Sequence, residues 1–314
     1  MHQPPLPPGT SREDDPIALC LAGRISLPVM LARLALSGWS DAAIEHALAE
    51  RPDAAPLLAF FRARAALLPQ LRATVMHVTH TPGADPAHIG EQFDAALAGA
   101  PEASVAAYSL GDPALLAEAT AELVGWLTQQ GYFSPGMDVL DLGCGFGRIA
   151  AALAPQAASV LGLDVAPRMI AEAQRRYGAI RHLHFAATPG TGLTALPDAA
   201  FDLVLAVDSF PYLLLAGAEV ARRHVRDVAR VLGNGGRFVV LNLSYGDDPA
   251  ADAARLARWA AAEGLCAEWA DAAPFRLWDA RAFVFARPHR IVRGDGLAIP
   301  PRFDATRQQS EDSR

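Results

Sequence analysis

The chain has 314 residues, 52% hydrophobic and 19% charged, which is enough for one large or two smaller globular domains with a substantial core. Its 27 basic and 34 acidic residues give a net charge of −7, which argues against general binding to nucleic acid or to an anionic membrane. The three cysteines are far apart and form no CxxC pair, so the sequence indicates neither a disulfide framework nor a zinc site. No apolar run is as long as a membrane span and the first residues lack a signal-peptide core, so we expect a cytoplasmic protein.

The N-terminal third of the chain predicts helices. Residues 1–14 and 293–314 are expected to be tails because of their composition, and residues 15–104 are expected to form a helical region. Asp15, Ser26 and Ser40 are placed to cap three helices that end near residues 23, 36 and 50. Asp53 is expected to open a longer helix that Pro69 kinks or splits, and a loop is expected over residues 77–88.

From residue 105 onwards, strand and helix patterns alternate up to residue 292. Apolar segments typical of buried strands occupy residues 138–142, 159–163, 182–186, 201–207, 237–241, 265–269 and 282–286. Helices fit residues 113–130, 148–153, 167–177, 216–232 and 249–263. Such βαβ repetition predicts an α/β fold with a mostly parallel, seven-stranded sheet covered by helices on both faces.

The segment 137–149, MDVLDLGCGFGRI, is the most informative stretch of the chain. An apolar strand ends at the acidic Asp141 and is followed by Gly143, Gly145 and Gly147 before the next helix. Glycine there allows a tight turn and a close approach of a ligand, and the helix that follows offers unpaired N–H groups. A dinucleotide fingerprint would need a glycine at position 148, where the chain has Arg148.

Acid-x-Gly-x-Gly-x-Gly after a strand resembles motif I of the class I S-adenosylmethionine-dependent methyltransferases. The stretches SVLGLD (159–164), FDLVLAVDS (201–209) and RVLGNGGRFV (230–239) are similar to the family's second, fourth and fifth strand regions, and Met169 to its adenine-covering residue. The resemblance covers about residues 105 to 290. It implies a Rossmann-like doubly wound fold and S-adenosyl-L-methionine as the cofactor.

The resemblance also implies where the cofactor binds. Asp164, at the end of the second strand, would accept the ribose hydroxyls, and its replacement should weaken cofactor binding and spare the fold. The loop after the third strand lacks the family's frequent acid, so backbone groups or the Thr188 hydroxyl would bind adenine, while Tyr108 would close over the methionine end. The full set of expected cofactor-binding residues is Tyr108, Asp141, Gly143, Cys144, Gly145, Gly147, Asp164, Val165, Met169, Thr188 and Asp208.

Methyl transfer from a sulfonium mainly requires alignment of the reactants and exclusion of water, and a weakly acidic acceptor also needs a base. The residues expected at the ends of the fourth and fifth strands for that task are Asp208, Tyr212 and Tyr245. Ser209-Phe210-Pro211-Tyr212 partly resembles the motif of amino-group methyltransferases, with Phe in place of the first Pro, and an active-site wall is the alternative. We expect the apolar helical region to act as a lid on the side of a small-molecule acceptor.

Several other features have plainer interpretations. Cys144 is expected to fill space, His77, His80 and His88 to be loop residues with no metal to bind, and Arg222, Arg226 and Arg230 to form a solvated helix face. An RNA or protein acceptor, and a catalytically silent S-adenosylmethionine-binding protein, stay open as alternatives.

Overall fold

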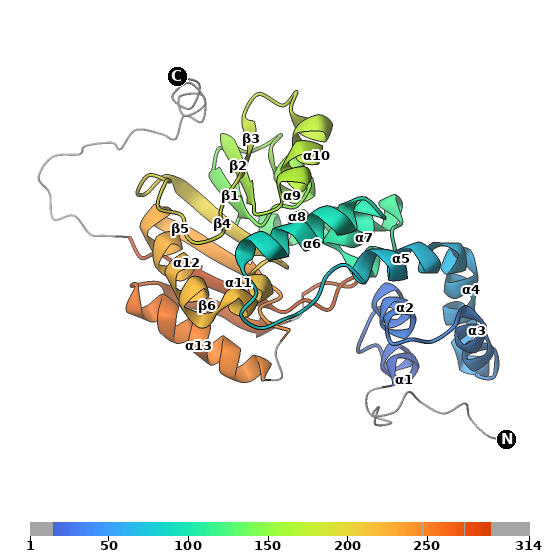
Figure 1. The fold of residues 1–314 in the computed structure, drawn as a ribbon. Coiled ribbons are helices and arrows are strands. Elements are labelled where there is room, and N and C mark those ends of the chain that lie inside the picture. The colour runs from blue at the N-terminus through green and yellow to red at the C-terminus, as the bar shows by residue number, and fades with distance from the viewer. Residues whose placement is uncertain (1–14, 246–247, 273, 290–314) are drawn as a thin grey trace, which may run out of the picture. The chain divides into compact units, whose positions relative to one another are not determined.

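The computed structural model describes residues 15–245, 248–272 and 274–289 (Figure 1). The tails expected at residues 1–14 and 293–314 lie outside this range. The chain divides into two compact units. Among the described residues, the helical unit comprises 15–79, 95–122 and 274–279, and the α/β unit comprises 80–94, 123–245, 248–272 and 280–289. Neither division falls at the boundary expected between residues 104 and 105, because residues 80–94 pack with the α/β unit and residues 105–122 with the helical one.

The first three helices of the helical unit form as their sequence indicates. They are α1 (Pro16–Leu21), α2 (Leu27–Leu36) and α3 (Asp41–Ala49). In each helix, the side chain of the residue just before it accepts a backbone N–H of the first turn: Asp15 accepts from Ile17, Ser26 from Val29 and Ser40 from Ala43. All three predicted caps are therefore present in the structure.

The segment after α3 is broken into short pieces. A 3₁₀ turn η2 (Pro52–Ala54) precedes α4 (Ala55–Arg64), and a second turn η3 (Ala65–Leu67) separates α4 from α5 (Leu68–Val75). The predicted split at Pro69 is present, because this proline lies in the first turn of α5, where its missing N–H costs no hydrogen bond. The longer helix does not open at Asp53 as predicted, since Asp53 lies inside η2 and α4 begins at Ala55 without a side-chain cap.

Two short elements of the helical unit are not predicted by the sequence patterns, namely α7 (Pro101–Val105) and the 3₁₀ turn η4 (Ala107–Ser109). The expected α8 (Pro113–Gln129) follows, and its residues up to 122 belong to the helical unit. Glu122 of α8 accepts the backbone N–H groups of Arg276 (2.8 Å) and Leu277 (3.2 Å), which attaches the distant segment 274–279 to this unit. Fully buried side chains from α2, α3 and α5 form its core, namely Met30, Leu31, Leu34, Ile44, Leu48, Leu68 and Leu71.

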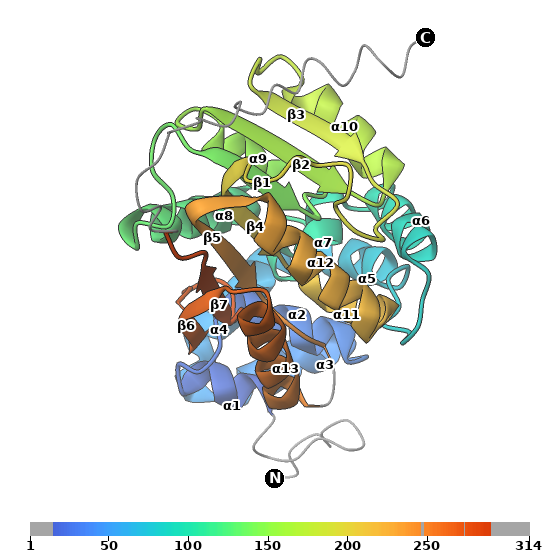
Figure 2. The same ribbon diagram turned by 90° about the vertical axis from the view of Figure 1, so that its left-hand side faces the viewer.

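The α/β unit is built on one seven-stranded sheet in the order β3-β2-β1-β4-β5-β7-β6 (Figure 2). The strands are β1 (Asp138–Leu142), β2 (Ser159–Asp164), β3 (Leu183–Ala187), β4 (Phe201–Val207), β5 (Leu232–Leu241), β6 (Cys266–Ala272) and β7 (Ala282–Ala286). Only β7 runs against its neighbours, β5 and β6. The predicted mostly parallel, seven-stranded α/β fold is therefore confirmed, and all the predicted strands are present, with bounds that differ by a few residues.

Helices connect the parallel strands as expected: α9 (Arg148–Leu153), α10 (Pro167–Tyr177), α12 (Ala218–Val231) and α13 (Pro249–Ala262). One face of the sheet packs on α12 and α13 through a single apolar cluster (Figure 2). The helix predicted over residues 216–232 is α12, and the structure adds a short helix before it, α11 (Phe210–Ala216), which ends at Gly217 because its φ of 136° does not continue a helix. A further helix that the sequence patterns do not predict, α6 (Pro86–Leu97), lies where part of the 77–88 loop was expected.

Across the described ranges, no helix combines the length and the apolar character that crossing a bilayer requires.

Candidate active site

The turn after β1 brings three segments of the α/β unit together. Gly143 has a φ of 76°, and a Cβ on it would lie 2.2 Å from the Cβ of Ser209. The N–H groups of Gly143 and Cys144 both donate to the carbonyl of Leu163, at 2.7 and 3.0 Å. The predicted tight turn is thus held against the end of β2 on one side and the start of α11 on the other.

Asp141 is the most unusual side chain of this region. It is 1% exposed, and its Oδ2 atom has no hydrogen-bond partner within the described part of the chain. Burial raises the pKa of this carboxyl from 3.8 to about 7, against a lowering by Arg148 and the N–H of Ala150 and with a smaller increase from Asp164. A buried acceptor without a donor is costly, so this position favours a ligand that supplies an N–H or a positive charge.

Asp164 ends β2 and faces the same glycine turn. Its Oδ2 accepts the N–H of Gly145 at 2.7 Å and its Oδ1 that of Ala166 at 2.9 Å. Burial raises the pKa of Asp164, and these backbone N–H groups oppose the increase. A carboxylate has about four acceptor positions, so these backbone donors leave room for a further hydroxyl. The side chain also fixes the turn itself, so the expectation that the fold is indifferent to Asp164 is at odds with these hydrogen bonds.

The residues expected near adenine follow Asp164 in space. The N–H of Thr188 donates to the Asp164 carbonyl at 2.9 Å, which places the start of the β3–β4 loop beside Val165 and the end of β2. The Thr188 hydroxyl accepts the N–H of Gly190 at 3.4 Å. Met169 lies in the first turn of α10 and is 1% exposed, so in this conformation it is part of the core. Their contact with adenine stays a prediction.

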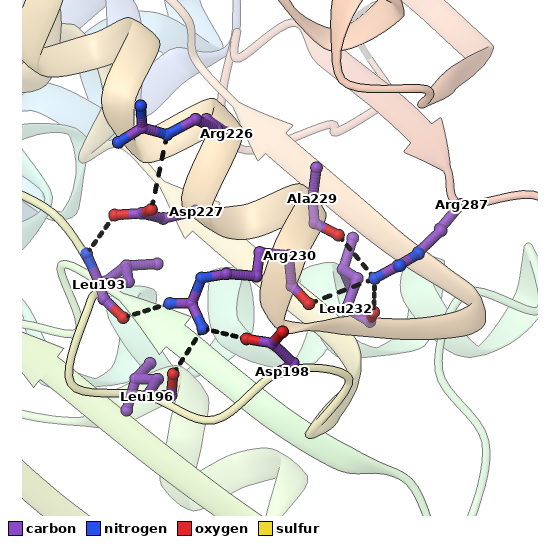
Figure 3. Close-up of polar contacts among 9 residues, drawn as sticks. All are labelled: Leu193, Leu196, Asp198, Arg226, Asp227, Ala229, Arg230, Leu232 and Arg287. Carbon is purple, nitrogen blue, oxygen red and sulfur yellow. Dashed lines mark hydrogen bonds and ion pairs between the residues drawn. The ribbon is translucent and has the colours of Figure 1, made fainter.

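The first acid in the β3–β4 loop, Asp198, is used within the protein. Arg230 of α12 donates to its carboxylate at 2.6 Å and to the carbonyls of Leu193 and Leu196 at 2.8 and 2.7 Å (Figure 3). Asp227, also on α12, accepts the N–H of Leu193 at 2.7 Å. Arg230 is therefore a structural clamp on this loop, and the solvated face expected for the arginine stripe is limited to Arg222 and Arg226, whose side chains are 59% and 58% exposed.

The C-terminal end of the same helix is closed by a second arginine. Arg287, which follows β7, donates to the carbonyls of Ala229 (2.7 Å), Arg230 (3.2 Å) and Leu232 (Figure 3). A cation at the last carbonyls of a helix complements its dipole. Both guanidinium groups are thus used within the protein, one on the β3–β4 loop and one on the C-terminal end of α12.

A second cluster of polar side chains lies where β4 and β5 end side by side. Asp208 follows β4 and Asn242 follows β5, both with left-handed backbone at φ values of 57° and 61°. The Asn242 amide donates to Asp208 Oδ1 at 2.6 Å, and the Tyr245 hydroxyl donates to the same oxygen at 2.5 Å. Non-glycine residues in this conformation are uncommon and cluster at functional sites.

The two predicted tyrosines lie together beside Asp208. Their rings are 5.7 Å apart in an edge-to-face arrangement, and their side chains are hydrogen-bonded to each other. Because the single proton of Tyr245 is donated to Asp208, Tyr212 must donate to the Tyr245 oxygen. Burial, followed by the Asp208 charge, raises the pKa of both tyrosines well above its usual value, so both hydroxyls stay protonated at neutral pH.

Two further aromatic residues, which the sequence patterns do not assign to the site, complete this cluster. His80 lies 4.6 Å from the ring of Tyr245 and 5.9 Å from that of Tyr212, and Phe93 of α6 lies 4.9 Å from Tyr212. Burial lowers the pKa of His80, which favours its neutral form. No local sequence motif predicts that these residues belong to the site, because they reach it only through the packing of segment 80–94 within the α/β unit.

The segment Ser209-Phe210-Pro211-Tyr212 is the first turn of α11. The Ser209 hydroxyl donates to the carbonyl of Leu142 at 2.5 Å, and Phe210 is fully buried in the core. Two of the four positions therefore serve the fold, and Tyr212 alone belongs to the polar cluster. This arrangement fits the active-site wall better than the amino-group motif.

The remaining candidates have structural surroundings. Cys144 is buried, and burial raises the pKa of its thiol well above the usual value, which fits a space-filling residue. Tyr108 lies in the helical unit, stacked on Trp278 at 5.4 Å, and its closure over the methionine end stays a prediction, as does the lid function of that unit. His88 contacts Glu91 and Gln92, and within the described residues no group of three or more His, Cys, Asp or Glu side chains could hold a metal ion.

Comparison with known proteins agrees with this geometry. Residues 140–240, from β1 to β5, match the family described as "Methyltransferase domain". A demethylmenaquinone methyltransferase of Tropheryma whipplei is 34% identical over 110 residues, which is 35% of this chain and 43% of that protein. An O-methyltransferase of Pyrenophora dematioidea is 32% identical over 130 residues, 40% of this chain and 46% of that protein.

Among solved structures, magnesium protoporphyrin IX methyltransferase from Synechocystis PCC 6803 with bound SAH aligns with 55% of this chain and 84% of its own, at 19% identity and a TM-score of 0.43. The chain thus matches somewhat less than half the length of its curated relatives, and the family model matches within the α/β unit. The family match includes the glycine turn after β1 and the two acids at the ends of β1 and β2. Residues 140–240 of the α/β unit are therefore similar to the methyltransferase-domain family, in agreement with the resemblance that the sequence shows.

Proposed function

We propose that the protein is a methyltransferase that uses S-adenosylmethionine to methylate a small organic acceptor. The observation that carries the proposal is Asp141, whose buried Oδ2 has no partner beside a glycine turn that already holds the second acid, Asp164. Two carboxylates at the ends of adjacent parallel strands, one unsatisfied, fit a ligand that has donors at both ends.

S-Adenosylmethionine has such donors, an ammonium group and two ribose hydroxyls. In this proposal Asp141 attracts the ammonium side through its unpaired oxygen, while Asp164 accepts a ribose hydroxyl in the acceptor position that its backbone donors leave free. A cationic ligand would also stabilise the ionised form of Asp141, which burial disfavours. When bound, the cofactor supplies a methyl group made electrophilic by its sulfonium.

The cluster after β4 and β5 supplies the acid–base groups. Asp208 is the candidate base, since it is a carboxylate that Asn242 and Tyr245 hold in place at the ends of β4 and β5 by donating to its Oδ1. Tyr245 can also relay, passing its own proton to Asp208 while its oxygen takes one from the acceptor hydroxyl. The raised pKa of each tyrosine argues against a free tyrosinate as the base.

The neighbouring rings favour a small, largely apolar acceptor. The rings of His80, Phe93, Tyr212 and Tyr245 form one cluster in the α/β unit. The Tyr245 hydroxyl is buried against Asp208 and Tyr212, while the residue as a whole is 39% exposed. Aromatic rings bind planar and apolar molecules through their faces and edges. The names of the curated relatives, a demethylmenaquinone methyltransferase and an O-methyltransferase, support the same class of acceptor.

Methyl-labelled S-adenosylmethionine incubated with the protein and fractionated cell extract tests the proposal. Label should enter small organic molecules, and the Tyr245→Phe variant, which cannot donate to Asp208, should transfer it more slowly. The exposed Arg222→Ala variant is the matched control and should transfer label at the normal rate. Label in RNA or protein would contradict the acceptor class, and no label despite cofactor binding would support a silent binding protein.

A further inference from the structure

Helix α6 reaches the cofactor side of the α/β unit as well as its aromatic cluster. The sequence leads us to expect the first hundred residues on the acceptor side only, yet Asp94 of α6 contacts α10, which begins just after the Asp164 loop. Asp94 Oδ1 accepts the N–H of Arg168 at 2.9 Å and that of Met169 at 3.3 Å. The residue that precedes α10, Ala166, has no side chain that could do this, so Asp94 caps α10 from another helix.

The same helix packs closely on the loop between β2 and α10. A Cβ on Gly90 would lie 2.6 Å from the carbonyl oxygen of Val165, so only glycine lets α6 approach so near. From the other side, a Cβ on Gly190 would lie 2.6 Å from Val165 Cγ1 and 2.8 Å from Pro86 Cβ. Val165, which follows the proposed ribose ligand, is thus enclosed between α6 and the β3–β4 loop.

The charge of Asp94 acts in two ways. A carboxylate at the first turn of α10 complements the positive end of the helix dipole. It also raises the pKa of Asp164, whose other surroundings are the N–H groups of Gly145, Val165 and Ala166, the Asp141 carboxyl at the end of β1 and the Cys144 thiol. Asp94 therefore affects both the position and the ionisation of the residue proposed to hold the ribose.

We propose that Asp94 is a positioning residue for the cofactor, which holds the Asp164–Met169 segment in its binding conformation by capping α10 from α6. This inference rests on the proposed function. The neighbouring Phe93 packs on Tyr212, so adjacent residues of one helix face the cofactor loop and the aromatic cluster.

The test is titration calorimetry of the full chain with S-adenosylhomocysteine, with thermal unfolding of the same samples. Asp94→Ala removes the cap and should weaken binding about tenfold, whereas Asp94→Asn keeps an acceptor oxygen and should restore most of the affinity at neutral pH. Asp248→Ala is the matched control: Asp248 caps α13 through the N–H of Ala251 at 2.9 Å, so its loss should lower stability and leave affinity unchanged.

A pH profile separates positioning from a merely structural effect. Loss of the neighbouring negative charge lowers the pKa of Asp164, so in Asp94→Asn the acidic pH at which affinity falls to half should move downward. Because it uses Asp94→Asn, this pH profile still tests the proposal if Asp94→Ala fails to fold. Unchanged affinity in a folded Asp94→Ala, or an Asp94→Asn profile identical to that of the wild type, would overturn the inference. Failure of the wild type itself to bind would instead overturn the proposed function.

Discussion

Replacement of Asp164 by alanine tests the geometry of the proposed cofactor site in the greatest detail. The carboxylate accepts two backbone N–H groups, from Gly145 at 2.7 Å and from Ala166 at 2.9 Å, and the residue is 9% exposed. Alanine leaves both N–H groups without a hydrogen-bond partner in a buried environment from which water is largely excluded. We therefore expect the variant to lose stability as well as cofactor affinity.

The size of each effect follows from the hydrogen bonds. A buried donor left unsatisfied costs about 1–3 kcal/mol, so two would cost roughly 2–6 kcal/mol. Burial of the Asp164 carboxylate is itself unfavourable, as its raised pKa shows, so removing it offsets part of this cost. We therefore expect the free energy of unfolding to fall by an amount near the lower end, about 2–3 kcal/mol. Loss of the bonds to the ribose should reduce affinity for S-adenosylhomocysteine at least about tenfold.

Urea unfolding and titration calorimetry measure the two effects separately. Asp164→Asn is the matched control for stability, since its amide oxygen can still accept one of the two N–H groups and its shape is the same. An alanine variant as stable as the wild type would show that the carboxylate does not hold the turn. Unchanged affinity in a folded variant would show that the ribose is bound elsewhere.

Three further predictions concern other residues of the α/β unit. Because burial raises the pKa of Asp141 from 3.8 to about 7, the folded state binds more protons than the unfolded one in this window, and stability without cofactor should fall as pH rises through it, by roughly 4 kcal/mol at most. Urea unfolding between pH 4 and 8 should show this decline in the wild type and a flatter curve in Asp141→Asn; parallel curves would contradict the shift. Tyr245→Phe should lower kcat by about tenfold or more with little change in cofactor affinity, since general acid–base groups contribute about 10²–10⁴-fold and Asp208 can still act directly; a normal kcat would exclude Tyr245 from proton transfer. Arg230→Ala should cost roughly 2 kcal/mol by freeing three acceptors of the β3–β4 loop, whereas Arg222→Ala on the same helix should change stability by less than about 0.5 kcal/mol, and equal effects in urea unfolding would contradict the clamp.

The sheet could be predicted because its strands are marked locally. Each of β1, β2 and β4 is a short apolar run that ends at an acid or a turn, and the order of these signals matched one family. The first helices were equally clear, since Asp15, Ser26 and Ser40 precede apolar periodic segments. Such features depend on residues close together in the sequence.

The errors arose where distant segments decide the structure. The start of α6 was expected as loop because residues 77–88 are rich in turn-forming types, yet the close approach at Gly90 and the cap from Asp94 stabilise the helix against the α/β unit. Arg230 was expected in solvent because its spacing places it on a stripe, and only the path of the β3–β4 loop supplies its partners.

The candidate site shows the same division. Asp208, Tyr212 and Tyr245 could be chosen from their places after predicted strands, and the structure brings the three together. Asn242 and His80 could not be found in this way. Asn242 joins the cluster through its left-handed backbone, and His80 through packing across more than a hundred residues of sequence.

The central claim is that the glycine turn and its two acids bind S-adenosylmethionine rather than a dinucleotide. Titration calorimetry of the full chain with S-adenosylhomocysteine and with NADH tests it most directly. We predict saturable binding of S-adenosylhomocysteine, weakened in Asp164→Ala, and no binding of NADH, because Arg148 stands where a dinucleotide fingerprint has glycine. Binding of NADH alone would contradict the claim.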